Sequence, residues 1–176
     1  HSRSTGSIPF MHVVDSQMLA FNQGVTRRGS YAAYMDISHP EIEEFIGMRK
    51  STGGDLNRKC LNLHNAINIT NEFLEAVKED RDWRLIDPKT NKAVKTINAR
   101  DLWWNLIYTR AETGEPYIIN IDLCNDLMPE EQKKLGLRIN QSNLCSEIML
   151  PTSEERTAVC CLSSVNLEHF DKWSKD

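Results

Sequence analysis

Short apolar runs alternate with amphipathic stretches along residues 8–121, and this alternation constrains the fold more than any other feature of the chain. Runs with the character of strands cover residues 31–37, 61–69 and 117–121. Much of the chain between and before them carries apolar residues at helical spacing. Strands separated by helices in this way are typical of βα units, in which the strands lie parallel. The sequence therefore predicts an α/β fold with a mostly parallel sheet and ligand sites at the carboxyl ends of its strands.

Capping residues mark the expected helix boundaries. Ser7 precedes Ile8 and Pro9, which predicts a helix over residues 8–22 with Ser7 as its N-cap. Ser38 and Glu41 have the spacing of a capping box for a short helix over residues 40–48. The other expected elements are a helix capped by Asn71 and running through Val77, a hairpin over residues 82–97, and a helix that is capped by Asn98 and ends before Gly114.

Two further strand-like runs follow Arg138. They are QSNLCSEIML (141–150) and TAVCCLSSVNL (157–167), joined by the polar turn PTSEER. In a strand, Asn143, Cys145 and Glu147 share one face, so an amide, a thiol and a carboxylate would point into one space. Burying the amide or the carboxylate without a partner costs a few kcal/mol, and a ligand with hydroxyl groups could supply the partners. The alternative is a surface strand in which the polar pair faces solvent.

Charge and cysteine spacing narrow the possible functions. The chain has 21 Lys+Arg against 25 Asp+Glu, a net charge of −4, and no long basic run, so we do not expect a nucleic-acid-binding protein. No apolar stretch is long enough for a membrane span, and we expect a cytoplasmic setting. The five cysteines are odd in number and contain no CxxC pair, which is typical of reduced thiols. Neither cysteines nor histidines have metal-ligand spacing, so we expect no metal site.

The segment that carries most of these cysteines resembles a known family. QSNLCSEIMLPT followed by AVCCLSSVNL is similar to the active-site segment of the large, catalytic subunit of ribonucleotide reductase. Other stretches resemble successive parts of that subunit in the same order: TGSIPFMHVVDS, FNQGVTRRGSYAAYMDISHPEIEEFI, RKSTGGDLNRKCLNLHNAINI, INARDLWWNLIYTRAETGEPYI and DLCN.

The resemblance implies that residues 1–176 are a partial catalytic barrel domain. The fold would be part of the family's ten-stranded α/β barrel, and residues 138–167 would contain the finger loop that carries the radical cysteine. Because the family's catalytic subunit is several times longer, we expect an internal fragment or a piece of a split subunit that is inactive without the rest.

The resemblance also implies the roles of individual residues. Cys145 would become the thiyl radical that abstracts the ribose 3′ hydrogen, Glu147 would be the general base on the 3′ hydroxyl, and Asn143 would orient the substrate. Cys160 would be one member of the redox pair that forms a disulfide as the 2′ hydroxyl leaves as water. Cys161 is expected to be a packed thiol without that role.

Residues 50–60, KSTGGDLNRKC, have paired glycines and no periodicity, which predicts a loop. From the residues alone this would be a solvated surface loop. The resemblance instead implies a loop between the specificity site for a deoxynucleoside triphosphate or ATP effector and the substrate base. Residues 1–6 resemble the tail of a second effector-contacting loop. The residues assigned to the effector loop are Thr52, Gly53, Gly54, Asp55, Arg58 and Lys59.

The resemblance further implies a set of partners. No cofactor would be bound directly, and a diiron or dimanganese small subunit would supply the radical. The segment SNLCSEI is similar to class I enzymes, whereas INARDLWWN and TRRG also resemble adenosylcobalamin-dependent class II enzymes. The other expected partners are the remaining segments of the catalytic subunit, a thioredoxin- or glutaredoxin-type reductant and a ribonucleoside diphosphate or triphosphate substrate. The competing hypothesis is a non-catalytic assembly or effector-binding segment whose active-site residues are relics.

Overall fold

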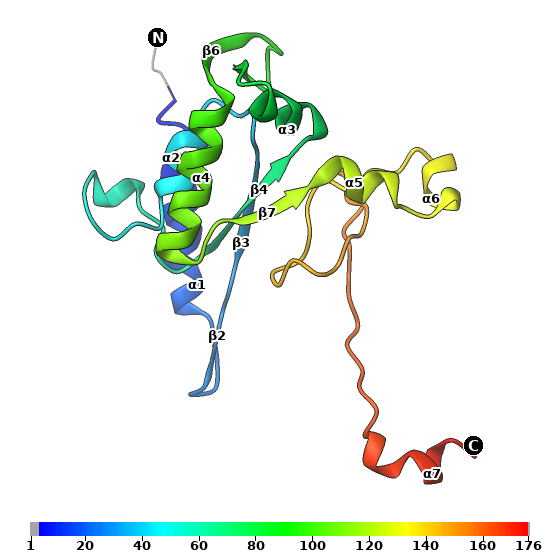
Figure 1. The fold of residues 1–176 in the computed structure, drawn as a ribbon. Helices are drawn as coiled ribbons and strands as arrows, with labels where there is room; N and C mark the ends of the chain where they lie inside the picture. Colours follow the sequence, from blue (N-terminus) through cyan, green and yellow to red (C-terminus); the bar gives the residue numbers. More distant parts are fainter. Residues whose placement is uncertain (1–3, 176) are drawn as a thin grey trace.

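A three-stranded parallel sheet lies at the centre of the computed structural model, which describes residues 4–175 (Figure 1). The first three of the residues expected to form an effector-contacting tail, and Asp176, lie outside the described part. The sheet has the order β3-β4-β7, with β4 in the middle and parallel to both neighbours. The predicted parallel arrangement is therefore confirmed. Its strands are β3 (Ala32–Asp36), β4 (His64–Ile69) and β7 (Tyr117–Asn120).

The two faces of this sheet are covered differently. Alternate residues of β3 and β4, such as Met35 and Ile67, pack against helices in the larger core cluster. Tyr34 and Ile119 point to the other face, where they pack with residues from the chain after β7. The helices that contribute to the larger core are α1 (Ile8–Ala20), α2 (Ile42–Gly47), α3 (Asn71–Lys78) and α4 (Ala99–Thr113).

The remaining elements are short. The predicted hairpin is confirmed as β5 (Asp82–Ile86) paired with β6 (Ala93–Asn98), and a smaller hairpin joins β1 (Asn22–Gln23) to β2 (Arg27–Arg28). Among residues 4–175, no helix has the length and apolar character needed to cross a membrane. The other helical turns are η1 (Leu56–Arg58), α5 (Ile121–Asp126), α6 (Glu130–Lys134), η2 (Leu167–His169) and α7 (Phe170–Trp173).

Three of the predicted helix caps are wrong, and one long-range contact explains the first two. Ser7 has helical backbone angles, and its Oγ donates to Glu41 Oε2 at 2.7 Å instead of capping α1. Glu41 is thereby drawn away from a capping box with Ser38, and α2 begins at Ile42 without a side-chain cap. Thr70, the residue before Asn71, caps α3 by accepting from the amide of Phe73.

The cap at Asn98 is confirmed. Its Oδ1 accepts a hydrogen bond from the amide of Asp101 at 3.0 Å. Gly114 follows the last residue of α4 with a φ of 80°, a left-handed conformation that favours glycine. Both ends of α4 therefore lie close to where local sequence signals put them.

The expected strands after Arg138 are wrong. Neither residues 141–150 nor residues 157–165 form a strand, although the turn between them has one isolated bridge from Ser153 to Arg156. Figure 1 shows residues 157–166 as an extended tail that leaves the body of the molecule and ends in α7. Val159 and Leu162 are 76% and 90% exposed. A strand needs a paired neighbour for its backbone groups, and alternating sequence alone does not supply one within the described chain.

Candidate active site

The segment around Cys145 is a turn organised by the side chain of Asn143. Asn143 Oδ1 accepts from the amides of Glu147 at 3.0 Å and Ile148 at 3.1 Å, and its carbonyl oxygen accepts from the amide of Ser146 at 3.2 Å. Ser146 has a φ of 70°, in the left-handed region that a non-glycine residue seldom adopts. Residues 143–148, which we call the thiol turn, therefore hold their shape through local hydrogen bonds.

The thiol turn leaves the side chains of Cys145 and Glu147 in solvent. Cys145 is an exposed free thiol, and Glu147 is also exposed. Asn143 is half-buried and uses its oxygen within the turn. The alternation of faces that a strand would give does not apply here, and Asn143, Cys145 and Glu147 are neighbours in a turn instead.

A cavity of about 620 Å³ lies beside the thiol turn. Asn143 and Cys160 both line it, although they are 17 positions apart in the sequence, and Arg156 adds a positive charge. Cys145 and Glu147 are not among its lining residues. The lining is mixed: Gln141, Ser142, Ser153 and Thr157 contribute polar groups, and Ile148, Leu150 and Ala158 contribute apolar surface. The structure therefore groups Asn143 with Cys160 around one cavity, which is open enough for a polar small molecule.

Cys161 does not fit its prediction. It is exposed, as Cys160 is, because the tail that carries both residues has no packing partner within the described chain. The packed thiol is instead Cys60, which is fully buried at the start of the β4 region. Burial, followed by the nearby Asp15 carboxylate, raises the pKa of Cys60 to about 11.

The predicted effector loop is exposed at its tip and anchored at its end. Thr52, Gly53, Gly54 and Asp55 are all exposed. Arg58 forms a double contact with the Glu44 carboxylate, one arm of it at 2.7 Å, and donates to the carbonyl of Thr5 at 2.8 Å. The hydrogen bond to Glu44 raises the pKa of Arg58.

The second basic residue of this loop, Lys59, contacts residues of α1 and α2. Its carbonyl oxygen accepts from His12 Nδ1 at 2.6 Å, and its ammonium group lies 3.5 Å from the carbonyl of Gly47. The exposed tip of the loop is therefore followed by two basic residues that are held in place.

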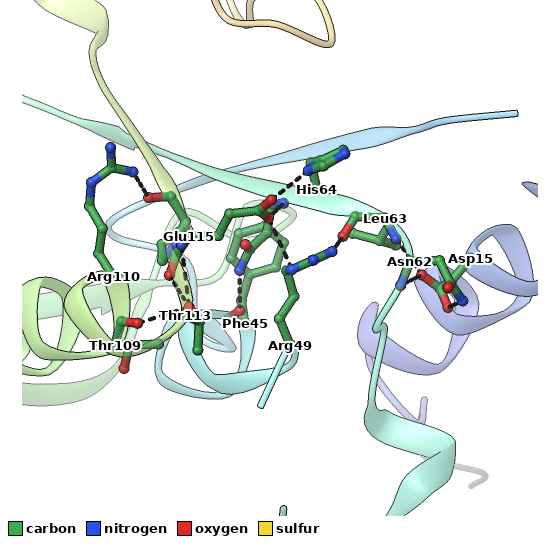
Figure 2. Close-up of polar contacts among 12 residues, drawn as sticks. Asp15, Phe45, Arg49, Asn62, Leu63, His64, Thr109, Arg110, Thr113 and Glu115 are labelled. Carbon is green, nitrogen blue, oxygen red and sulfur yellow. Dashed lines mark hydrogen bonds and ion pairs between the residues drawn. The ribbon is translucent and has the colours of Figure 1, made fainter. Parts of the chain in front are cut away.

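Figure 2 shows a buried polar network that the sequence analysis did not find. Glu115 contacts His64 Nδ1 at 2.5 Å, Arg49 Nε at 3.1 Å and the amide of Asn65 at 3.2 Å. Arg49 also donates to the carbonyl of Leu63. The network joins the end of α2 to the starts of β4 and β7, so its position favours a structural role.

A second buried carboxylate supports the same region. Asp15 is 3% exposed and accepts from the amides of Asn62 at 2.8 Å and Leu63 at 2.5 Å (Figure 2). Its place on an otherwise apolar face of the expected helix over residues 8–22 was the one available signal. Within residues 4–175, no group of three or more side chains has the arrangement of a metal site.

Parallel strands covered by helices on one face, with a cysteine-bearing turn on the other, define part of an α/β domain. The family model described as "Ribonucleotide reductase, barrel domain" matches residues 1–176. The chain therefore belongs to the ribonucleotide reductase family and consists of barrel-domain sequence. The predicted family and fold class are confirmed.

Individual relatives agree with this assignment. A protein of Frog virus 3 (isolate Goorha), whose name also describes a ribonucleoside-diphosphate reductase large subunit, is 54% identical over 172 residues, covering 98% of this chain and 30% of the relative. The large subunit of Invertebrate iridescent virus 3 is 44% identical over 225 residues, covering 97% and 36%. The solved Actinobacillus ureae class Id ribonucleotide reductase alpha subunit is 32% identical with a TM-score of 0.73, and 97% of this chain matches 28% of it. The chain thus spans about a third of the length of these relatives.

Proposed function

We propose that this chain supplies the active-site segment of a ribonucleotide reductase catalytic subunit, which reduces ribonucleotides to deoxyribonucleotides by thiyl-radical chemistry. The observation that carries the proposal is the family match over the whole chain, combined with a thiol turn that lies beside a cavity lined by Asn143 and Cys160. The relatives' names, which specify ribonucleoside-diphosphate reductases, favour a diphosphate substrate. Because the chain spans about a third of those relatives, activity requires the remaining segments.

Cys145 is proposed as the hydrogen-atom acceptor. Its exposed sulfur, as a thiyl radical, takes the ribose 3′ hydrogen and leaves a carbon radical, and the S–H bond returns the hydrogen later. Glu147, two residues further and also exposed, is proposed to take the proton of the 3′ hydroxyl. Asn143 Oδ1 holds the thiol turn, which leaves its amide nitrogen to donate to a substrate hydroxyl.

Cys160 is proposed as the electron donor. Together with a second cysteine outside this chain it would lose two electrons and two protons to form a disulfide, while the 2′ hydroxyl departs as water. Its place in the lining of the same cavity as Asn143 supports this role. A thioredoxin- or glutaredoxin-type protein would then reduce the disulfide.

The source of the radical belongs to the proposal too. Similarity to a class Id alpha subunit favours a separate small subunit with a diiron or dimanganese centre, and adenosylcobalamin is the alternative. We place the reaction in the cytoplasm, where deoxynucleotides are needed and thiols stay reduced.

For residues 50–60 we retain the effector-sensing role as a proposal. The exposed tip could contact a bound nucleotide, whereas Arg58 would have to leave Glu44 to do so. Binding of a deoxynucleoside triphosphate to the completed enzyme should slow amide hydrogen exchange in residues 51–57. Unchanged exchange at saturating effector would leave an ordinary surface loop.

The adjacent cysteines provide a matched test of the proposed function. The chain is mixed with the missing catalytic-subunit segments, a radical source and a reductant, and both deoxynucleotide and released base are measured. Cys160→Ser should stop deoxynucleotide formation and release base, because the substrate radical forms but cannot be reduced. Cys161→Ser should behave as the unmodified chain. Normal turnover by Cys160→Ser would favour the non-catalytic alternative.

A further inference from the structure

Two tyrosines and one alanine form a row across the face of the sheet that carries the thiol turn. Tyr34 in β3 is in register with Ala66 in β4, and Ala66 is in register with Tyr117 in β7. Neighbouring strands lie roughly 4.8 Å apart, so the backbones of the two tyrosines are about 10 Å apart with only a methyl group between them. The row therefore places one tyrosine on each side of a fully buried alanine.

Tyr34 holds the thiol turn on both sides of Cys145. Its hydroxyl donates to the carbonyl oxygen of Asn143 at 2.8 Å and lies 3.2 Å from Ser146 Oγ. These partners stand two residues before and one residue after the cysteine. A single side chain of the rigid sheet thus attaches to the turn at two points, across 109 and 112 positions of sequence.

Tyr117 lies on the other side of Ala66 in this row. Burial is the largest cause that raises the pKa of Tyr117, followed by the charge of the Glu115 carboxylate. The ring of His64 stacks on Tyr117 with centroids 6.0 Å apart and planes 7° apart. His64 is itself held by Glu115, so Tyr117 is supported by the buried network of Figure 2.

Asn68 anchors the chain just before the turn. Its Nδ2 donates to the carbonyl of Asn140 at 2.9 Å and to Asp36 Oδ1 at 3.0 Å. It is 4% exposed and belongs to the same sheet face as Ala66, two residues earlier. The segment from residue 140 to residue 146 is thus fastened to the sheet at both ends.

From this geometry we propose that Tyr34, in the row that it forms with Ala66 and Tyr117, is a positioning residue for the sulfur of Cys145. The proposal rests on the proposed function for its chemical consequence: hydrogen-atom transfer needs the reacting atoms held at about 3–3.5 Å in the correct orientation. A turn in solvent could not maintain that placement without a rigid attachment. The sheet supplies it through hydroxyl groups, which leave the sulfur free.

Hydrogen exchange tests the positioning role without requiring turnover. In the chain as it stands, Tyr34→Phe removes only the hydroxyl, and the amides of Ser146, Glu147 and Ile148 should exchange about 10-fold faster or more. Tyr31→Phe is the matched control, because it makes the same change three residues away, where the described chain gives that hydroxyl no partner. Exchange within α4 should stay the same in both variants, which shows that the fold is intact. Equal exchange of the three turn amides in Tyr34→Phe and the unmodified chain would overturn the proposal.

A double-mutant cycle and a kinetic readout separate positioning from general support. The effect of Tyr34→Phe on exchange should be about 2-fold or more smaller in a Ser146→Ala background, because the two hydroxyls share one contact. In the completed enzyme, Tyr34→Phe should lower kcat by about 10-fold with KM changed less than about 2-fold. Additive effects on exchange, or a loss confined to KM, would contradict the proposal. If exchange responds as expected but the unmodified chain never turns over with its complementing segments, the proposed function fails and the positioning geometry stands.

Discussion

The frame, residues 4–137, and the segment that follows it, residues 138–175, differ in where their polar side chains find partners. In the frame, Glu115 and Asp15 are buried and each is bonded to groups far away in the sequence. In the segment, Cys145, Glu147 and Cys160 are exposed, and most hydrogen bonds are local. The difference teaches that conformational stability and proposed chemistry are carried by separate stretches of one chain. Tyr34, Asn68 and Asn125 are among the frame residues that hold the segment.

The largest effect on stability should come from breaking the Glu115 network. Glu115→Ala leaves Arg49 and the amide of Asn65 without their acceptor in a buried site, so the free energy of unfolding should fall by about 3–5 kcal/mol. Urea unfolding followed by circular dichroism measures this. Glu112→Ala is the control, because its pair with Lys50 is at the surface and should contribute less than about 1 kcal/mol. Equal losses in the two variants would remove the distinction between buried and exposed pairs.

A smaller loss is expected at Asp15. Asp15→Ala removes the acceptor of the Asn62 and Leu63 amides and should lower the free energy of unfolding by about 2–3 kcal/mol. Asp101→Ala, at the first turn of α4, should cost about 0.5 kcal/mol because it removes only a favourable interaction with the helix dipole. If Asp15→Ala lowers the free energy of unfolding no more than Asp101→Ala does, the conformation of the residues before β4 does not depend on the Asp15 carboxylate.

The frame shows which features could be predicted from the sequence and which could not. The strands, the hairpin and the cap at Asn98 follow from local periodicity and local hydrogen bonding, and all were found. The contact of Ser7 with Glu41 spans 34 positions, and that of His64 with Glu115 spans 51, so no local pattern reports them.

The candidate site shows the same limit. The residues around Cys145 were identified by resemblance to a family, whereas their strand conformation, inferred from alternation, was wrong. Asn143 can hydrogen-bond backbone amides locally, and that tendency stabilised a turn instead. Tyr34 gave no signal at all, because an apolar strand with one tyrosine is ordinary and its partners come from residues 143 and 146.

The buried Cys60 of the frame and the exposed cysteines of the segment should respond differently to pH and to alkylation. Because the folded pKa of Cys60 is about 11 and lies above the unfolded value, its contribution to stability is complete below about pH 8.5 and is lost as the pH rises toward 11. The free energy of unfolding should therefore fall by about 2 kcal/mol over that range, and Cys60→Ala should remove this part of the pH dependence.

At pH 8 iodoacetamide should modify Cys145, Cys160 and Cys161 well before Cys60. Rapid modification of Cys60 in the folded chain would contradict its burial.

The smallest effect is expected in the tail. Leu162 is 90% exposed, so Leu162→Ala should change the free energy of unfolding by less than about 0.5 kcal/mol. The same substitution at the fully buried Leu106 should cost about 2–5 kcal/mol. Comparable costs would mean that the tail packs against the frame in solution, and the division between the two regions would have to be redrawn.

The most direct test of the division between frame and chemistry is Cys145→Ser. Serine keeps the size of the side chain, but its O–H bond is much stronger than S–H, so it cannot relay a hydrogen atom. Because Cys145 is exposed, the free energy of unfolding should change by less than about 0.5 kcal/mol. Deoxynucleotide formation by the variant, combined with the complementing segments, radical source and reductant, should fall to background while Cys161→Ser retains it. Substantial deoxynucleotide formation by Cys145→Ser would contradict the account.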